Sequence, residues 1–359
     1  MYSASPLPTP DLKPYPHPPF GHPGSSPGQA LLPEAGGKRP PLVPKLHSPT
    51  LYSRRLREPI IDILRAAIPF LLFALNTLLH VTLLLALAAF KAVPVERVRT
   101  RVSAWLVAIG QSWIACNTRL IGAATPTRWR VEGMAEVKRD GWYLVVSNHQ
   151  SWVDIPVLQA VFNRRAPFLK FFLKRQLRWV PALGAAWWAL DFPFMHRHTR
   201  AELERRPELR GQDREATQRA CRRFARLPTS VMNFLEGTRY TPGKHAAMQS
   251  PYAGLLPPRA GGVAFVLDAM GGLLRSVIDV TIAYPGGRPS LLDLLAGRIP
   301  EIRVDVRERA IPEALLAGDY EGDAAFRQRF QAWINGLWAD KEATLAGLLA
   351  APAATDGPP

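Results

Sequence analysis

The chain has 359 residues, 47 % hydrophobic and 21 % charged, which suits one large domain or two modest ones with tails and excludes a collagen-like or wholly disordered chain. The formal net charge of +16 points to an anionic partner, which can be nucleic acid, phospholipid head groups or phosphorylated substrates. The two cysteines, Cys116 and Cys221, form no CxxC or Cys/His spacing. We therefore expect a reducing compartment, with neither a disulfide framework nor a structural zinc site.

Prolines mark the first segment of the chain, because 14 of the 35 fall within the first 50 residues. We predict a disordered, partly polyproline tail over residues 1–52 and a second disordered tail over 351–359. The first tail is either a partner-binding polyproline ligand or a dispensable extension. No apolar segment directly follows Met1, so a secretory signal peptide is not expected.

The strongest membrane signal is the apolar run at 66–90, AAIPFLLFALNTLLHVTLLLALAAF, which contains no charged residue. At 1.5 Å per residue, a helix of this length crosses a hydrocarbon core of roughly 30 Å. The alternative is a buried helix of a soluble core. Basic residues flank the run on both sides, so the positive-inside rule sets no orientation.

Symmetric flanks favour a helix pair that returns to its starting side. The second member is expected at 104–122, where apolar residues recur near helical spacing; they are Trp105, Ile109, Trp113 and Leu120. We therefore predict a membrane-anchoring helical hairpin over 60–124, which either crosses the bilayer twice or dips into one leaflet.

After this hairpin the pattern changes to short apolar strands separated by helical stretches, which predicts an α/β domain over 128–310 with a central mixed sheet flanked by helices. The strands are expected at 142–147, 230–235 and 277–284, and helices at 154–162, 214–226 and 262–270. C-terminal helices are expected over 311–350, where apolar residues recur at helical spacing; they are Phe326, Phe330, Trp333 and Leu337.

Two polar clusters follow predicted strands, at the carboxyl ends where α/β sheets usually place ligands. In the first, Asn148 to Asp154 (NHQSWVD), the Asp154 carboxylate can reach back across a strand-to-helix turn to His149. That contact would fix the tautomer and leave the other ring nitrogen as a general base. The alternative is a structural pair in which Asp154 caps the next helix.

The second cluster is Asn233 to Arg239 (NFLEGTR). Its glycine, Gly237, allows close backbone approach, and Arg239 can hold a phosphate through a bidentate fork. The alternative is a β-turn with a surface ion pair.

Together, NHQSWVD and FLEGTR resemble the paired HxxxxD and EGTR motifs of the glycerolipid acyltransferases, in particular the 1-acylglycerol-3-phosphate (lysophosphatidate) acyltransferases. ALDFPFMHR at 189–197 and DVTIAYP at 279–285 are similar to two further blocks of that family. KFFLKRQLRWVPALG and LLPPRAGGVAF resemble the branch of lysocardiolipin acyltransferase and its bacterial relatives. The resemblance covers about residues 60–300, with departures at Leu235, where many members have proline, and Arg259, where this branch often has lysine.

The resemblance implies transfer of a fatty acyl chain from acyl-CoA or acyl carrier protein to a lysophospholipid hydroxyl, with no cofactor beyond the thioester co-substrate and no metal. His149 would be the base and Asp154 its orienting carboxylate, so that Ser151, which sits in no GxSxG elbow, is not the nucleophile but bonds locally within its turn. The acceptor phosphate would be held by Glu236, Gly237, Thr238 and Arg239, with Arg197. Either backbone N–H groups near Gly237 or the Asn148 side chain would support the oxyanion. Phe194 belongs to the second block, and Lys174, with Lys170 four residues away on one helical face, would meet phosphate or the membrane surface.

The expected acceptor is 1-acyl-sn-glycerol-3-phosphate, with lysophosphatidylglycerol, lysocardiolipin or a lyso-ornithine lipid as alternatives. Basic residues also line the predicted helical region at 200–226. This is either a solvated helical face or one that adheres to anionic lipid, so an anionic membrane surface is an expected partner. A non-catalytic membrane scaffold is the alternative of another class. No nucleic-acid-binding pattern is present, and the lone HxH of His196 and His198 does not make a metal site. The Arg- and Ala-rich composition suggests a GC-rich bacterial genome. We therefore expect a bacterial inner membrane protein, with the catalytic domain facing the cytoplasm because both substrate pools suit that side.

Overall fold

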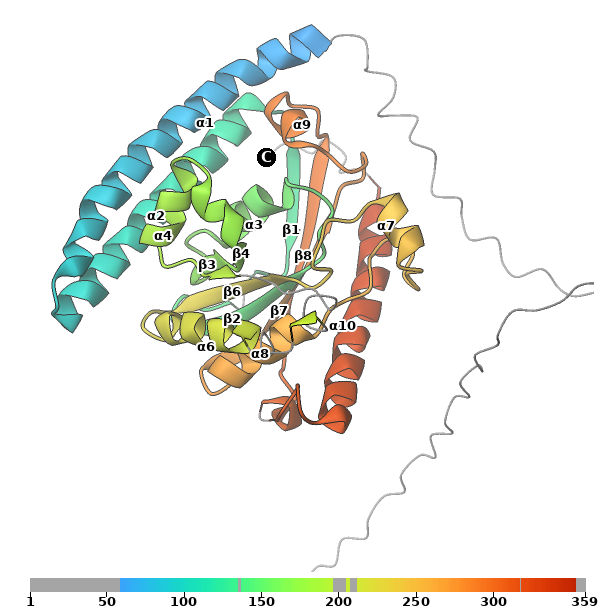
Figure 1. Cartoon of the computed structure of the whole chain (residues 1–359). Helices are drawn as coiled ribbons and strands as arrows, with labels where there is room; N and C mark the ends of the chain where they lie inside the picture. The colour runs from blue at the N-terminus through green and yellow to red at the C-terminus, as the bar shows by residue number, and fades with distance from the viewer. Residues whose placement is uncertain (1–58, 135–136, 196–204, 207–211, 317, 353–359) are drawn as a thin grey trace, which may run out of the picture. The chain divides into compact units, whose positions relative to one another are not determined.

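The computed structural model describes residues 59–134, 137–195, 205–206, 212–316 and 318–352 (Figure 1). The proline-rich segment at 1–52 and most of the tail predicted at 351–359 lie outside the described residues. So does Arg197, together with the HxH motif beside it.

A six-stranded mixed sheet forms the centre of the described chain, in the order β1-β8-β7-β2-β6-β3. Its strands are β1 (Arg128–Glu132), β2 (Trp142–Ser147), β3 (Phe168–Phe171), β6 (Thr229–Phe234), β7 (Leu274–Ala283) and β8 (Glu301–Arg309). All neighbours are parallel except β7 and β8. The mixed sheet confirms the predicted fold class, and the three strands expected from sequence are β2, β6 and β7, the three adjacent central strands.

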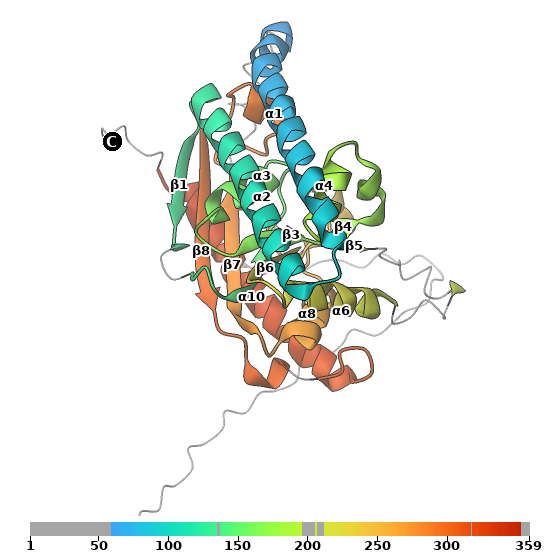
Figure 2. The same cartoon turned by 90° about the vertical axis from the view of Figure 1, so that its left-hand side faces the viewer.

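Helices cover both faces of the sheet (Figures 1 and 2). One face packs against α3 (Asp154–Phe162), α4 (Leu183–Ala189) and the N-terminal helices, and the other against α6 (Gln212–Phe224), α8 (Gly261–Met270) and α10 (Ala324–Ala350). Strand β2 is almost wholly buried because both faces are covered, which explains its uninterrupted apolar run. Three of the predicted core positions of α10, Phe326, Phe330 and Leu337, are buried.

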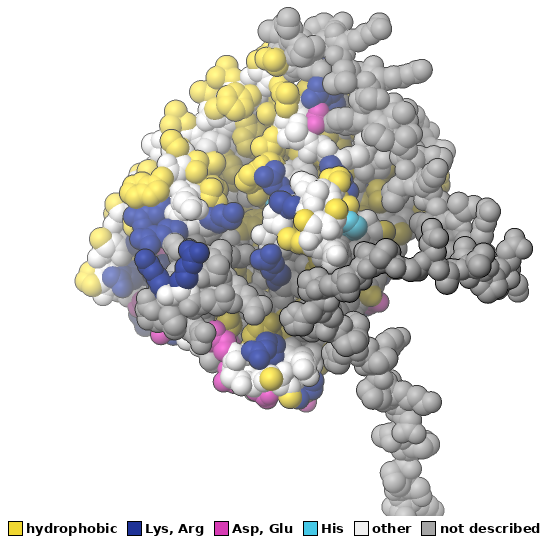
Figure 3. Space-filling view, turned by 45° about the vertical axis from the view of Figure 1, so that its right-hand side comes forward, with side chains coloured by type: hydrophobic (Ala, Val, Ile, Leu, Met, Phe, Trp, Pro, Cys, Tyr) yellow, Lys and Arg dark blue, Asp and Glu magenta, His cyan; other side chains and the backbone are white. Residues whose placement is uncertain are grey.

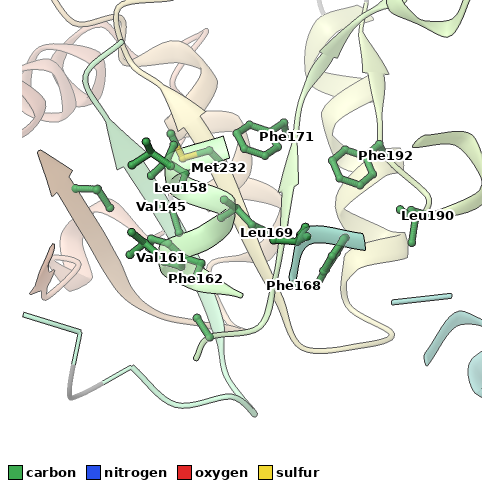
Figure 4. Packing of buried hydrophobic residues seen from close by; sticks show 14 of the residues in the cluster. Val145, Leu158, Val161, Phe162, Phe168, Leu169, Phe171, Leu190, Phe192 and Met232 are labelled. Carbon is green, nitrogen blue, oxygen red and sulfur yellow. The ribbon is translucent and has the colours of Figure 1, made fainter. Parts of the chain in front are cut away.

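Figure 4 shows the packing on the α3 face, where Val145, Leu158 and Met232 gather in one cluster with Phe171 beside Met232. Phe168 and Phe192 meet edge to face, with ring centroids 6.2 Å apart. Strands β2, β3 and β6 are thereby locked against α3. This packing fixes the positions of the carboxyl ends of β2 and β6.

A helical hairpin precedes the sheet, formed by α1 (Pro59–Ala88) and α2 (Glu96–Ala124) with a short 3-10 turn, η3 (Ala89–Ala92), between them. Figure 2 shows the two helices side by side. Polar side chains of α1 face α2: Asn76 Nδ2 donates to Asn117 Oδ1 at 2.7 Å, and Trp113 Nε1 donates to Thr77 Oγ1 at 3.1 Å. The polar groups that interrupt the apolar run are thus paired inside the hairpin.

The outer side of α1 is apolar and exposed. Its exposed residues include Ile68, Phe70, Leu71, Leu75, Leu78, Leu79 and Leu83. Within the described chain, one helical stretch, Arg65–Ala92, is long and apolar enough to cross a membrane, and only 17 % of its most apolar part is buried. A core helix of a soluble protein would be mostly buried, so this stretch is a candidate membrane anchor.

Helix α1 also lies along the domain that follows it. It contacts α4 and α9 (Leu291–Leu295), and its buried side chains are Ala66 in its first part and His80, Val81, Leu84 and Ala88 in its last part. Just beyond the helix, Lys91 Nζ lies 2.6 Å from Asp191 Oδ2. The hairpin is therefore attached to the sheet domain through the contacts of α1 with α4 and α9 and through Lys91.

The expected helical face carrying Lys170 and Lys174 is wrong. Lys170 lies in β3, and Lys174 in β4 (Leu173–Lys174), which pairs with β5 (Phe194–Met195) in a small second sheet. Lys170 is buried, which lowers the pKa of its ammonium to about 8, whereas Lys174 is exposed. Their environments differ because the chain between them is not one continuous element: Lys170 belongs to the six-stranded sheet and Lys174 to the separate two-stranded sheet.

Candidate active site

The two sequence clusters meet at the carboxyl ends of adjacent parallel strands. Ser147, the last residue of β2, pairs in register with Phe234 of β6 and Val280 of β7. The chain beyond β2 and the chain beyond β6 stay together, because the Tyr240 N–H donates to the His149 carbonyl at 2.8 Å. The sheet thus assembles in one place the two motifs that the sequence keeps over eighty residues apart.

His149 and Asp154 form a direct pair. His149 Nδ1 lies 2.8 Å from Asp154 Oδ2; the carboxylate is fully buried and the histidine side chain is 12 % exposed. The imidazole stacks on the Phe234 ring, with centroids 3.9 Å apart and planes 12° from parallel. Among the described residues Nε2 has no hydrogen-bond partner, so the ring is oriented at one nitrogen and available at the other.

Asp154 accepts hydrogen bonds from the backbone of the turn and from Tyr284 as well as from His149. Its Oδ2 accepts the backbone N–H groups of Gln150 and Ser151 at 2.7 and 2.9 Å, and its Oδ1 accepts the Tyr284 hydroxyl at 2.6 Å. Burial beside this carboxylate raises the pKa of Tyr284 well above its usual range. The alternative in which Asp154 merely caps α3 is wrong, because the N-cap of α3 is Val153 and the carboxylate bonds to groups before the helix.

Glu236 lies beneath the surface of the EGTR turn. It is fully buried, and neither carboxyl oxygen makes a hydrogen bond of normal geometry with a described residue. Burial raises its pKa to about 8, with Asp154 adding to the effect and the backbone N–H groups of His149 and Leu256, and more weakly Lys341, opposing it. Glu236 is therefore largely a neutral acid at pH 7, not an exposed phosphate ligand.

The rest of the EGTR turn faces outward. Gly237 has φ +67°, and a Cβ there would lie 3.3 Å from Cδ of Arg259, so the turn requires glycine. Thr238 Oγ1 accepts Lys244 Nζ at 2.6 Å, and the same ammonium donates to the Arg239 carbonyl at 3.1 Å. The Arg239 guanidinium lies over the Trp152 ring, 4.4 Å from its centroid, which ties this turn to the His149 turn.

Comparison with known proteins agrees with this geometry. Residues 128–285 match the family model described as Acyltransferase. The chain carries a domain of the acyltransferase family. Among curated relatives, it is 28 % identical over 185 residues to human 1-acyl-sn-glycerol-3-phosphate acyltransferase gamma, covering 48 % of this chain and 44 % of that protein. The human delta protein of the same name is 25 % identical over 213 residues, covering 56 % of this chain and 51 % of that protein.

The aligned part thus spans about half the length of these curated relatives. Among solved structures, the 1-acyl-sn-glycerophosphate acyltransferase PlsC from Thermotoga maritima superposes with a TM-score of 0.47 and 16 % identity. That superposition covers 81 % of this chain and 99 % of that one.

Two predicted substrate-binding residues of the acyltransferase domain belong to its scaffold. Asn148 is fully buried, and its side-chain amide both donates to and accepts from the backbone of Ile282 at 2.9 Å, fastening β2 to β7. Ser151 Oγ donates to the Pro289 carbonyl and accepts the Val153 N–H at 3.0 Å, which confirms its expected role in local hydrogen bonding. Contact of either side chain with substrate stays a prediction.

Of three further predicted residues, two lie on the small second sheet and one lies outside the described chain. Lys174 and Phe194 sit on the paired strands β4 and β5, Lys174 exposed and Phe194 half-buried. Arg197 lies outside the described residues. A separate open pocket of about 430 Å³, lined by Arg139, Arg164 and Phe168 among others, adjoins the amino ends of β3 and β6 and contains none of the predicted site residues.

Sequence reasoning missed four side chains of the site: Tyr284, Phe234, Lys244 and Arg288. Phe234 and Tyr284 fall inside quoted motif blocks, so their positions were marked but their roles were not. Lys244 lies in α7 (Pro242–Ala247), directly after the EGTR motif. Among the described residues, no group of three His, Cys, Asp or Glu side chains is placed to hold a metal ion.

Proposed function

We propose that this protein is a membrane-bound acyltransferase that moves a fatty acyl chain from a thioester, acyl-CoA or acyl carrier protein, to the free hydroxyl of 1-acyl-sn-glycerol-3-phosphate. The observation that carries the proposal is the His149–Asp154–Tyr284 arrangement beside the EGTR turn, inside an acyltransferase domain. The names of the curated relatives support the choice of acceptor.

In the proposed reaction, His149 Nε2 takes the proton of the acceptor hydroxyl as its oxygen attacks the thioester carbonyl carbon. The C–S bond then breaks, and the departing thiolate receives that proton from the imidazolium. Asp154 keeps Nδ1 protonated and stabilises the imidazolium charge. No acyl-enzyme intermediate is required, because the acceptor alcohol is itself the nucleophile, and no cofactor enters beyond the thioester co-substrate.

Arg239 is the proposed ligand of the acceptor phosphate. Arg239 is half-buried, its guanidinium lies over the Trp152 ring, and it forms no ion pair with another described residue. Arginine in this state presents a planar fork that matches a phosphate. Lys244 supports the same turn from beneath.

The hairpin is the proposed membrane anchor, lying in one leaflet. Because α1 contacts both α4 and α9 of the sheet domain, a bilayer crossing would draw that polar domain into the hydrocarbon. Exposed Trp105, Trp179 and Trp188 suit the membrane interface. Figure 3 shows an extended apolar area with groups of Lys and Arg side chains below it, which fits an anionic surface such as the cytoplasmic face of a bacterial inner membrane.

The test is acyl transfer by the purified full chain in phospholipid vesicles. With palmitoyl-CoA as donor, lysophosphatidate should be converted to phosphatidic acid, identified by mass spectrometry, and a parallel panel should include lysophosphatidylglycerol, lysocardiolipin and a lyso-ornithine lipid. If another lysophospholipid of the panel is acylated faster, that lipid is the acceptor and the proposed acyl transfer still holds. Absence of transfer to every member would overturn the proposal and favour a non-catalytic scaffold.

Two variants test the mechanism. His149→Ala should lower kcat by about 10²–10⁴-fold, the usual contribution of a general base, while vesicle binding stays unchanged. Ser151→Ala is the matched control from the same turn and should keep most of the activity. A parental rate in His149→Ala, or a loss in Ser151→Ala as large as that in His149→Ala, would contradict the assignment.

A further inference from the structure

Arg288 lies outside every sequence motif, yet its side chain contacts the His149 turn. It follows β7, and its Nε donates to the side-chain oxygen of Gln150 at 2.9 Å. Its guanidinium lies over the Tyr240 ring, 3.8 Å from the centroid. The neighbouring Pro289 carbonyl accepts the Ser151 hydroxyl, so this loop is fastened to the catalytic turn at two consecutive residues.

The partner of Arg288 is itself held in place. Gln150 Nε2 donates to the Gly254 carbonyl at 3.1 Å, and the Gly254 N–H donates to Glu342 Oε1 at 2.9 Å. The amide oxygen of Gln150 is thereby directed at Arg288. A guanidinium fixed through Nε and an aromatic face keeps its two terminal NH₂ groups for a ligand, with little conformational freedom left to lose on binding.

Arg288 and Arg239 show the same arrangement on two different loops, each of which contacts the His149 turn. Arg239 stacks on Trp152, and Arg288 stacks on Tyr240 while bonding to Gln150. Among the described residues, neither guanidinium has a carboxylate partner. Two unneutralised arginines beside one histidine match a reaction in which two phosphate-bearing molecules meet, or one molecule brings two phosphates.

We infer that Arg288, held by Gln150 and Tyr240, forms a second phosphate-binding subsite beside His149, distinct from the one at Arg239. The inference rests on the proposed acyl transfer for its role in turnover. The phosphate comes either from the nucleotide part of an acyl-CoA donor or from a second phosphodiester on the acceptor.

Kinetics of Arg288→Gln in the full chain distinguish the two sources. If the donor supplies the phosphate, KM for palmitoyl-CoA rises about ten- to a hundred-fold, as expected for a lost bidentate contact, while KM for palmitoyl-pantetheine, which lacks phosphate, is unchanged. If the acceptor supplies it, KM rises for monolysocardiolipin, with two phosphates, and not for lysophosphatidate. Arg275→Gln, an exposed arginine at the opposite end of β7, is the matched control.

Calorimetric titration with inorganic pyrophosphate needs no turnover and therefore stands apart from the proposed function. The parent protein should bind pyrophosphate saturably, Arg288→Gln should weaken that binding at least ten-fold, and Arg275→Gln should not. Equal affinity in the parent protein and Arg288→Gln, or no saturable binding to the parent protein, overturns the subsite. The subsite is also overturned if the KM of Arg288→Gln stays within about two-fold of the parent value for every substrate. A parent protein that binds pyrophosphate but transfers no acyl chain would instead refute the proposed function alone.

Discussion

Two buried carboxylates on neighbouring elements of this protein have opposite surroundings. Asp154 accepts four hydrogen bonds, and its basic partner His149 keeps a 12 % exposed side chain. Asp279 of β7 pairs with Lys341 of α10, which also donates to the Val280 carbonyl at 2.6 Å, and both side chains of that pair are sealed from solvent. Burial lowers the pKa of the Lys341 ammonium, while Asp279 opposes that change.

The difference distinguishes a pair that can take part in proton transfer, His149–Asp154, from a pair that only stabilises the fold, Asp279–Lys341. A buried acid paired with a base that still reaches solvent can orient that base for proton transfer. A buried pair with no exposed member exchanges nothing with a substrate, and it tethers α10 to the sheet below the site. Substitutions in the two pairs should therefore change different quantities.

The largest effect on turnover is expected for Asp154→Asn. The amide cannot accept all the N–H groups that now converge on Oδ2, and it does not keep Nδ1 of His149 protonated, so kcat should fall by about 10²–10⁴-fold. Asp279→Asn is the matched control, and its kcat per folded molecule should stay within a few-fold of the parent. Equal losses of kcat in the two variants would contradict the different roles assigned to Asp154 and Asp279.

The largest effect on stability is expected for Lys341→Met. Removal of one partner leaves Asp279 as an uncompensated buried charge, which should lower the free energy of unfolding by about 3–5 kcal/mol. Urea unfolding in detergent measures this, and the double variant Lys341→Met/Asp279→Asn should recover much of the loss. If the double variant were less stable than Lys341→Met alone, the pair would not be the cause.

Tyr284→Phe should lower both kcat and the free energy of unfolding, each by less than the substitutions above. It removes a single hydrogen bond to the Asp154 carboxylate, worth about 1.5–3 kcal/mol for a charged acceptor. The free energy of unfolding should fall within that range, and kcat should fall less than in Asp154→Asn. A kcat as low as that of Asp154→Asn would give the hydroxyl a direct role in the reaction.

The smallest effect is expected for Glu236→Gln and depends on pH. Because the folded-state pKa is about 8 against an ordinary value of 4.5, the unfolded chain is ionised between these values while the folded chain keeps its proton. Raising the pH through this window therefore destabilises the parent by about 1.4 kcal/mol per unit, and Glu236→Gln lacks that contribution. The free energy of unfolding, measured at pH 6 and pH 7, should fall with pH more steeply in the parent than in Glu236→Gln. If it changes equally with pH in the two proteins, Glu236 is ionised when folded.

Local patterns predicted the central strands and the two motifs well, since β2, β6 and α3 each carry a short-range signal. The edge strand β3 was missed because Lys170 and Lys174 at a spacing of four resemble a helix as readily as a strand. The antiparallel β8 and the pairing of β1 with it depend on partners far along the chain. No window of sequence around Asp279 contains Lys341, so their ion pair had no local signal.

The sequence by itself determined the pairing of His149 with Asp154, the glycine that the EGTR turn requires, and an apolar span with basic flanks. Each of these depends on neighbours within a few residues. Tertiary structure alone decided that Glu236 is buried as a neutral acid, that Tyr284 completes the bonding of Asp154, and that Arg288 reaches Gln150. Those outcomes depend on which strands lie side by side, because burial and long-range hydrogen bonds are properties of the packed sheet rather than of any segment.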